Sequence, residues 1–196
     1  MKIKPLFFLF FFLSYPFWGY AEQEKERTYY NEILLGGGSS IKGFGETSQE
    51  VRTVDILWRH ARIFNKKESG WLKGNHEFWI EVPFSFLISD SDDNDSNDIG
   101  MVGAHFLFAW VFPETRIGKP YFLIGGGPQY ILANIDGVGS DLCGNYQMGL
   151  GIRISLPKEK SMNLEVRYHH ISNLGFAEPN IPLNSVKFFF GMMLPF

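Results

Sequence analysis

The chain has 196 residues, a formal net charge of −3 and a single cysteine, Cys143. This length suits one domain. One cysteine excludes an internal disulfide and a cysteine-based metal cluster. The slightly acidic balance provides no basic patch of the kind that nucleic acid requires, so we expect no nucleic-acid partner.

The first residues have the layout of a secretory signal peptide. Lys2 and Lys4 precede a short apolar run, 6–13, and Gly19-Tyr20-Ala21 offers small residues at a cleavage site. The apolar run is too short for an uncleaved membrane anchor. We therefore predict a signal peptide over 1–21 and a single domain over 22–196. An exported chain without a long apolar helix is soluble, lipid-anchored or a β-barrel, and no cysteine stands near the cleavage site to carry a lipid.

Alternation of apolar and polar residues with a period of two dominates the rest of the chain, which indicates β-strands. In chain order the expected strands are 31–42, 50–64, 76–89, 99–112, 120–132, 143–155, 162–172 and 184–196. Turns and loops separate them, and the longest polar connection, 90–98, is acidic. Its resemblance to a calcium loop is superficial, because Asp95 stands where such a loop needs glycine and Met101 where it needs a bidentate glutamate.

Each expected strand has one apolar face and one polar or small face. In the strand 143–155, Tyr146 and Met148 alternate with Gln147 and Arg153. The interior of an eight-stranded barrel is too narrow for so many aromatic rings, so the apolar face should look outward to lipid and the charges should pair inside. We predict an all-β fold, an eight-stranded antiparallel transmembrane β-barrel of the bacterial outer membrane. A soluble exported barrel that binds an apolar ligand is the alternative.

The end of the chain supports the membrane interpretation. Apolar residues alternate back from Phe196, as in the terminal strand of bacterial outer-membrane proteins. Such barrels have short periplasmic turns and longer outer loops, with both termini in the periplasm. The strand 162–172 then runs outward and ends at the outer rim.

That outer end carries a candidate catalytic pair, His170 and Ser172. Residues two apart on a strand share a face, and here the shared face is the apolar one. The imidazole can take the serine proton as general base while the serine attacks an ester. Asn184, on the next strand with the same parity, can hold the other ring nitrogen of His170. The alternative interpretation is that His170 and Ser172 are ordinary interfacial residues of the headgroup zone.

The stretch His170-Ile171-Ser172-Asn173-Leu174-Gly175, followed by Pro179-Asn180 and Leu183-Asn184-Ser185, resembles the lipid A 3-O-deacylase (PagL) family. The resemblance implies a hydrolase of the bacterial outer membrane that removes the ester-linked 3-hydroxyacyl chain of lipid A without a cofactor or metal. It further implies that Ser172 is the nucleophile, that His170 is the base and that Asn173 and Asn180 line the oxyanion hole. The implied partners are lipid A, or lipopolysaccharide, and the membrane, with a homodimer left open.

One position departs from the family pattern. The family has an acid about where Asn184 stands, and an amide can orient His170 but cannot offset the charge of the imidazolium. Glu178 is the acid nearest in sequence and is a second candidate for that role. On this reasoning Asn184→Asp or Asn184→Glu should hold or raise the activity. The departure also favours the competing hypothesis, a non-enzymatic small outer-membrane barrel for adhesion or membrane integrity. His169 has the opposite parity, so we expect it inside, paired with Glu165 or Arg167.

Overall fold

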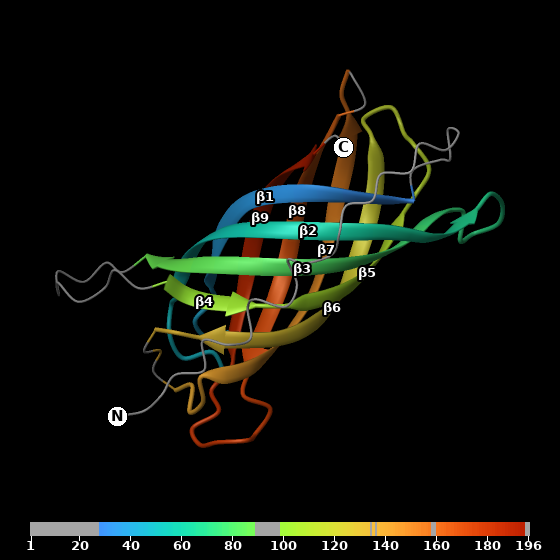
Figure 1. The fold of residues 1–196 in the computed structure, drawn as a ribbon. Helices are drawn as coiled ribbons and strands as arrows, with labels where there is room; N and C mark the ends of the chain where they lie inside the picture. The colour runs from blue at the N-terminus through green and yellow to red at the C-terminus, as the bar shows by residue number, and fades with distance from the viewer. Residues whose placement is uncertain (1–27, 89–98, 134, 136, 158–159, 195–196) are drawn as a thin grey trace, which may run out of the picture.

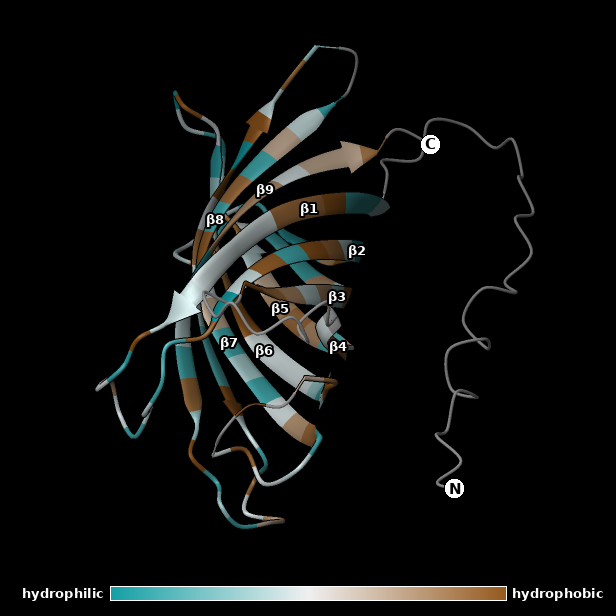
Figure 2. Ribbon diagram, turned by 90° about the vertical axis from the view of Figure 1, so that its left-hand side faces the viewer, coloured by the Kyte–Doolittle hydropathy of each residue, from teal (hydrophilic) through white to brown (hydrophobic). Residues whose placement is uncertain are grey.

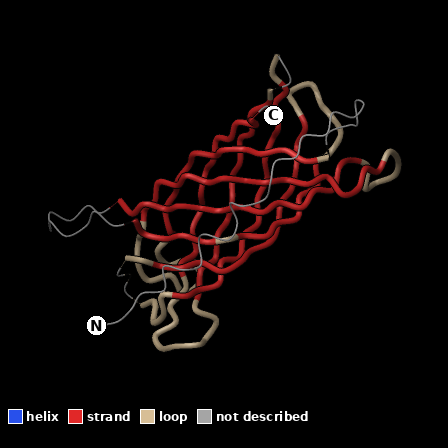
Figure 3. The backbone as a smooth tube through the Cα atoms, viewed as in Figure 1, coloured by secondary structure: helices blue, strands red, loops and turns tan. Residues whose placement is uncertain are grey.

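The computed structural model describes residues 28–88, 99–133, 135, 137–157 and 160–194. The strands in this part of the chain are β1 (Tyr29–Ser40), β2 (Arg52–Lys67), β3 (Gly74–Ile88), β4 (Ile99–Gly103), β5 (His105–Val111), β6 (Lys119–Ile131), β7 (Leu142–Ser155), β8 (Ser161–Ser172) and β9 (Leu183–Leu194). All pairings are antiparallel, and β1 pairs with both β2 and β9, so the sheet closes into a barrel (Figure 1). The wall of the barrel is strand almost throughout (Figure 3). No helix of the described residues is long and apolar enough to cross a membrane.

The strands β4 and β5 share one position in the ring, because both pair with β3 on one side and with β6 on the other. Continuing these registers places Ala104, the break between them, opposite Pro128 of β6, and places the preceding Gly103 opposite Pro83 of β3. Proline has no N–H to donate to a sheet ladder, which accounts for the interruption. The barrel therefore has eight strand positions, and the predicted eight-stranded fold is confirmed.

The two rims of the barrel differ in the length of their connections. The connections 41–51 and 173–182 and the described residues of 132–141 lie at one rim, which we call the long-loop rim. The connections 68–73 and 112–118 and the described residues of 156–160 lie at the other. The start of β1 pairs with the end of β9, Asn31 with Leu194, at the short-loop rim. By the rule for outer-membrane barrels the long-loop rim faces outward.

Apolar and polar residues alternate along the strands, as the bands of colour in Figure 2 show. The outward side chains are apolar and exposed, among them Phe188, Leu150 and Phe108. An exposed apolar surface of this extent is expected where the surroundings are lipid.

The interior is filled by charged side chains in ion pairs. Arg59 donates to Glu32, Glu81 and Glu165 at 2.6–2.7 Å, and all four side chains are fully buried. The guanidinium of Arg59 also lies 3.8 Å from the centre of the Trp79 ring. Lys187 pairs with Asp55 at 2.9 Å. Charges can be buried at this density only when they are paired, and the predicted pairing of lumenal charges is present.

Three sequence predictions fall outside the described residues. These are the signal peptide over 1–21, the acidic loop 90–98 and the terminal Phe196.

Candidate functional site

The candidate site lies where β8 ends at the long-loop rim. His170 pairs across the sheet with Tyr146 of β7 on one side and with Asn184 of β9 on the other. Ser172 lies two residues further along and pairs with Gly144. His170 and Ser172 share the outward face of β8 with the exposed Leu164 and Val166, so the pair lies above a lipid-facing surface.

His170 is held by Asn184. Its Nδ1 lies 2.8 Å from Oδ1 of Asn184, and the hydroxyl of Tyr168 donates to the same oxygen at 2.5 Å. A carboxamide oxygen only accepts hydrogen bonds, so Nδ1 of His170 carries the proton. The unprotonated nitrogen of the neutral ring is then Nε2, the position from which a histidine can act as a base.

Asn184 faces outward but is almost fully buried, because the connection 41–51 folds over it. Its Nδ2 donates to the carbonyl of Phe44 at 3.1 Å and to Oγ1 of Thr47 at 2.8 Å. Its backbone N–H donates to the same Oγ1 at 2.9 Å, and its carbonyl accepts from the N–H of Ile41. Thr47, Phe44 and the hydroxyl of Tyr168 were not among the site residues predicted from the sequence. Parity with His170 is a signal for Tyr168, but nothing in the sequence pattern points to Thr47.

Ser172 is 9% exposed, the last residue of β8 before the connection 173–182. Residues two apart on a strand are separated by about 6.6–6.8 Å along its axis. No hydrogen bond joins Ser172 to His170 within the described residues. Hydrogen bonds between catalytic groups often tighten only when substrate is bound.

Asn173 and Asn180 together organise the connection 173–182. The N–H of Asn173 donates to Oδ1 of Asn180 at 2.9 Å, and its side-chain Nδ2 donates to the carbonyls of Ala177 and Pro179. Its Oδ1 accepts from the N–H of Gly175. The amide protons of Asn173 are therefore engaged within the loop. Among the described residues, Nδ2 of Asn180 has no acceptor, so of the two side chains it is the one with a donor to offer.

Glu178 is exposed on the same connection. In the described part of the chain it forms no ion pair with His170, whose Nδ1 is taken up by Asn184. The geometry therefore favours Asn184 over Glu178 as the partner of the imidazole.

Two adjoining hollows lie on the outer surface beside His170. The larger, about 540 Å³, extends over β6, β7 and β8, and the smaller, about 250 Å³, extends toward the connection 173–182. They share Gly127 and Tyr146, and the ring of Tyr146 lies 6.3 Å from that of His170. The larger is lined by Ile124, Gly125, Gly126, Gly127, Tyr146, Gln147, Met148 and Tyr168, and the smaller also by Leu174 and Phe176. The lining is mainly apolar or glycine, which suits an acyl chain.

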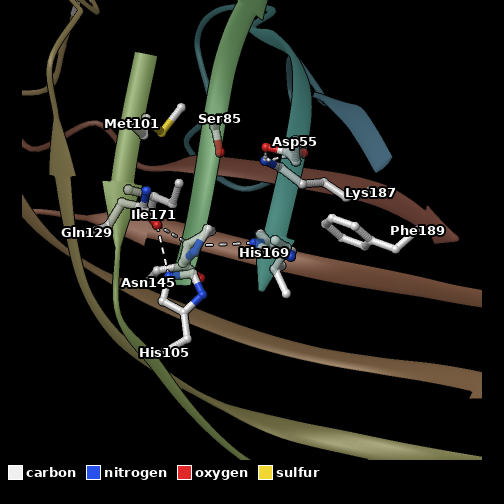
Figure 4. A pocket seen from close by; sticks show the side chains of 12 residues that line it. Asp55, Ser85, Met101, His105, Gln129, Asn145, His169, Ile171, Lys187 and Phe189 are labelled. Atoms are coloured by element: carbon white, nitrogen blue, oxygen red, sulfur yellow. Dashed lines mark hydrogen bonds and ion pairs between the residues drawn. The ribbon is translucent and has the colours of Figure 1, made fainter. Parts of the chain in front are cut away.

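On the inner side of the wall lies a buried polar cluster, shown in Figure 4. His105 is 2.9 Å from Gln129, and Asn145 donates to Gln129 at 3.2 Å. His169 is buried here as its parity predicts, but the expected pairing with Glu165 or Arg167 is wrong: its neighbour is Asn145, at 3.4 Å. The guanidinium of Arg167 instead donates hydrogen bonds to Glu81, Gln147 and Glu165. No group of three metal-ligating side chains occurs in the described ranges.

The fold and this site together define a class: an eight-stranded membrane-spanning β-barrel with a histidine–serine pair on its outer surface. A profile of the lipid A 3-O-deacylase (PagL) family matches residues 52–193. The chain therefore belongs to the PagL lipid A 3-O-deacylase family. No curated protein sequence matches it.

Two solved structures resemble the fold. The outer membrane enzyme PagL matches with a TM-score of 0.55 and 18% identity, over 84% of this chain and 99% of that one. The Neisserial surface protein A (NspA) matches with a TM-score of 0.59 and 10% identity, over 87% of this chain and 98% of that one. At these identities the likeness establishes the fold. The chain is an outer-membrane β-barrel, as predicted.

Proposed function

We propose that this protein hydrolyses the ester-linked 3-hydroxyacyl chain of lipid A in the outer leaflet, with Ser172 as nucleophile and His170 as general base. Family membership supports lipid A 3-O-deacylation as the activity. The observation that carries the residue roles is the 2.8 Å hydrogen bond from Nδ1 of His170 to Asn184. It leaves Nε2 free to accept a proton on a lipid-facing surface.

In the first half of the reaction, Nε2 of His170 accepts the hydroxyl proton of Ser172 as the serine oxygen attacks the ester carbonyl. The carbonyl oxygen becomes an oxyanion, and Nδ2 of Asn180 is the nearby donor proposed to stabilise it. Asn173 contributes by holding Oδ1 of Asn180 through its N–H. Collapse of the intermediate breaks the ester bond. The imidazolium then returns its proton to the departing 3-oxygen of the sugar, leaving an acyl-serine.

In the second half, water replaces the sugar. His170 accepts a proton from water, the hydroxide attacks the acyl-serine, and the proton returns to Ser172 as the 3-hydroxy fatty acid leaves. Asn184 keeps the ring oriented through both halves but carries no charge to offset the imidazolium.

The two hollows beside His170 are proposed to bind the acyl chain of the substrate. Their lining is apolar, and they open on the lipid-facing surface, so an acyl chain entering them leaves one apolar environment for another. The reactive ester then lies level with the headgroups, where the long-loop rim and Ser172 are. The substrate reaches the site within the membrane.

The test is to express the protein in a Gram-negative host and to weigh the lipid A by mass spectrometry. The proposal expects loss of one 3-hydroxyacyl chain, and it expects Ser172→Ala and His170→Ala to restore the full mass. His60 supplies a matched control: it also faces outward, and its Nδ1 lies 2.9 Å from Oδ1 of Asn31 on the neighbouring strand. His60→Ala should leave deacylation unchanged.

Folding is checked in each case by heat-modifiable mobility in detergent. Unchanged lipid A in cells with correctly folded wild-type barrel would contradict the proposal and favour the non-enzymatic barrel. A homodimer stays a prediction, to be tested by crosslinking in the membrane.

A further inference from the structure

The side-chain amide of Asn184 differs from a carboxylate in a way that affects the protonation of the His170 ring. A carboxylate offers an acceptor from either oxygen, so its orientation does not affect the imidazole beside it. A carboxamide has an accepting end and a donating end. If the amide of Asn184 were turned over, Nδ2 would face His170, and Nδ1 would have to accept. The proton would then move to Nε2, and the ring would lose its base toward Ser172.

The connection 41–51 decides which end faces His170. The carbonyl of Phe44 can only accept, and it lies 3.1 Å from Nδ2 of Asn184. The hydroxyl of Thr47 has a single proton, and it donates that proton to the carbonyl of Pro182 at 3.0 Å. Toward Asn184, Oγ1 of Thr47 therefore presents only acceptor capacity, to Nδ2 at 2.8 Å and to the backbone N–H at 2.9 Å. Two acceptors thus meet the donating end of the amide.

The turn in the connection 41–51 holds its backbone close to the Asn184 side chain. Its turn is closed by hydrogen bonds from Gly43 N–H to the Thr47 carbonyl and from Phe44 N–H to the Ile41 carbonyl. Gly45 has φ +58°, and a Cβ there would lie 3.0 Å from Nδ2 of Asn184. A side chain at Gly45 would both strain the turn and press on the amide.

We propose that the connection 41–51 sets the tautomer of His170 by fixing the orientation of the Asn184 carboxamide, with Thr47 as the positioning residue. This rests on the proposed function of His170 as base. It assigns a role to a segment that, among the described residues, has no hydrogen bond to the imidazole or to Ser172, and it explains how an amide can orient the imidazole. The hydroxyl of Tyr168, which donates to Oδ1 at 2.5 Å, supports the same orientation from the other side.

The test compares Thr47→Val, which removes the hydroxyl and keeps the branched shape, with Thr47→Ser, which keeps the hydroxyl. Thr53→Val is the matched control, because Thr53 is equally buried and its hydroxyl donates to Asp55, away from the site. With purified barrel and lipid A in mixed micelles, Thr47→Val should lower kcat about ten-fold, roughly the worth of one hydrogen bond, at unchanged KM. Thr47→Ser and Thr53→Val should stay close to wild type.

The second readout does not depend on activity. In ¹⁵N-histidine-labelled barrel at alkaline pH, nitrogen spectra distinguish the Nδ1–H from the Nε2–H tautomer, and His170→Gln identifies the signal. Wild type should show Nδ1–H at His170, and Thr47→Val should show a mixture of both forms. His60, held by Asn31, serves as the internal reference that should not change.

An inactive wild type with the expected tautomer shift would refute the proposed function and support the role of the loop in setting the tautomer. An active wild type whose Thr47→Val variant keeps the Nδ1–H tautomer overturns the inference, whether or not its kcat falls, since a fall alone would then reflect general destabilisation.

Discussion

Oδ1 of Asn184 accepts a hydrogen bond from Nδ1 of His170 at 2.8 Å, across the pair of strands β8 and β9. The far end of the amide is held by Phe44 and Thr47. The site is therefore a chain of contacts that runs from an outer loop, through a buried amide, to an imidazole on the lipid-facing surface.

These contacts change the effect on activity that is expected of a carboxylate at position 184. The sequence alone suggests that Asn184→Asp holds or raises activity. In the structure, Asp would place an oxygen against the carbonyl of Phe44 and the acceptor side of Thr47. An unsatisfied buried polar group costs about 1–3 kcal/mol, and this cost opposes what an ion pair with the imidazolium would gain. We now expect Asn184→Asp to lower kcat about ten-fold in micellar assays. A kcat at or above wild type would contradict the role of the loop.

The oxyanion proposal is tested by Asn180→Asp. This change keeps the oxygen that accepts from the N–H of Asn173 and removes the Nδ2 donor. Removing one oxyanion donor typically lowers kcat by about 10²–10³, and we expect a loss in this range with the loop intact. Asn75→Asp, at the short-loop rim, is the control. If Asn180→Asp keeps wild-type kcat, another group stabilises the oxyanion.

The hollow on β6 to β8 is tested by filling it. Met148 lines the larger hollow, and Leu150, the next outward residue on β7, does not. Met148→Trp should raise KM for lipid A several-fold with a smaller change in kcat, because it occupies space proposed for the acyl chain. Leu150→Trp adds the same bulk to the same strand and should leave KM unchanged. Equal effects of the two changes would mean that the hollow does not bind substrate.

The interior ion pairs should matter for stability and not for chemistry. In the described residues, Arg59 is the cation paired with Glu32, so Arg59→Met leaves that buried carboxylate without one. Breaking a buried pair in this way costs about 3–5 kcal/mol, to be measured by urea unfolding in lipid vesicles. Arg52→Met, in an exposed pair with Glu50, should cost about 0–1 kcal/mol. Activity per folded barrel should be the same in both variants.

Much of the fold could be predicted from the sequence. Alternation with a period of two is a local property of a strand, and in a narrow barrel the bulk of the aromatic rings decides which face looks outward. The strand limits expected from this pattern lie within three residues of those observed wherever the structure describes them. The break at Ala104 was not anticipated, although prolines on both neighbouring strands, Pro83 and Pro128, account for it.

By itself, the sequence determined the barrel, the outward parity of His170, Ser172 and Asn184, and the family to which the chain belongs. Only the tertiary structure decided that Asn184 is buried beneath the connection 41–51 and that Thr47 and Phe44 orient it. It also decided that His169 lies beside Asn145 and forms no ion pair with Glu165. The physical reason is the separation along the sequence of the residues that interact. Parity follows from the backbone of one strand, whereas the contacts of Asn184 join residues about 140 positions apart, and only closure of the barrel by β1 and β9 brings them together.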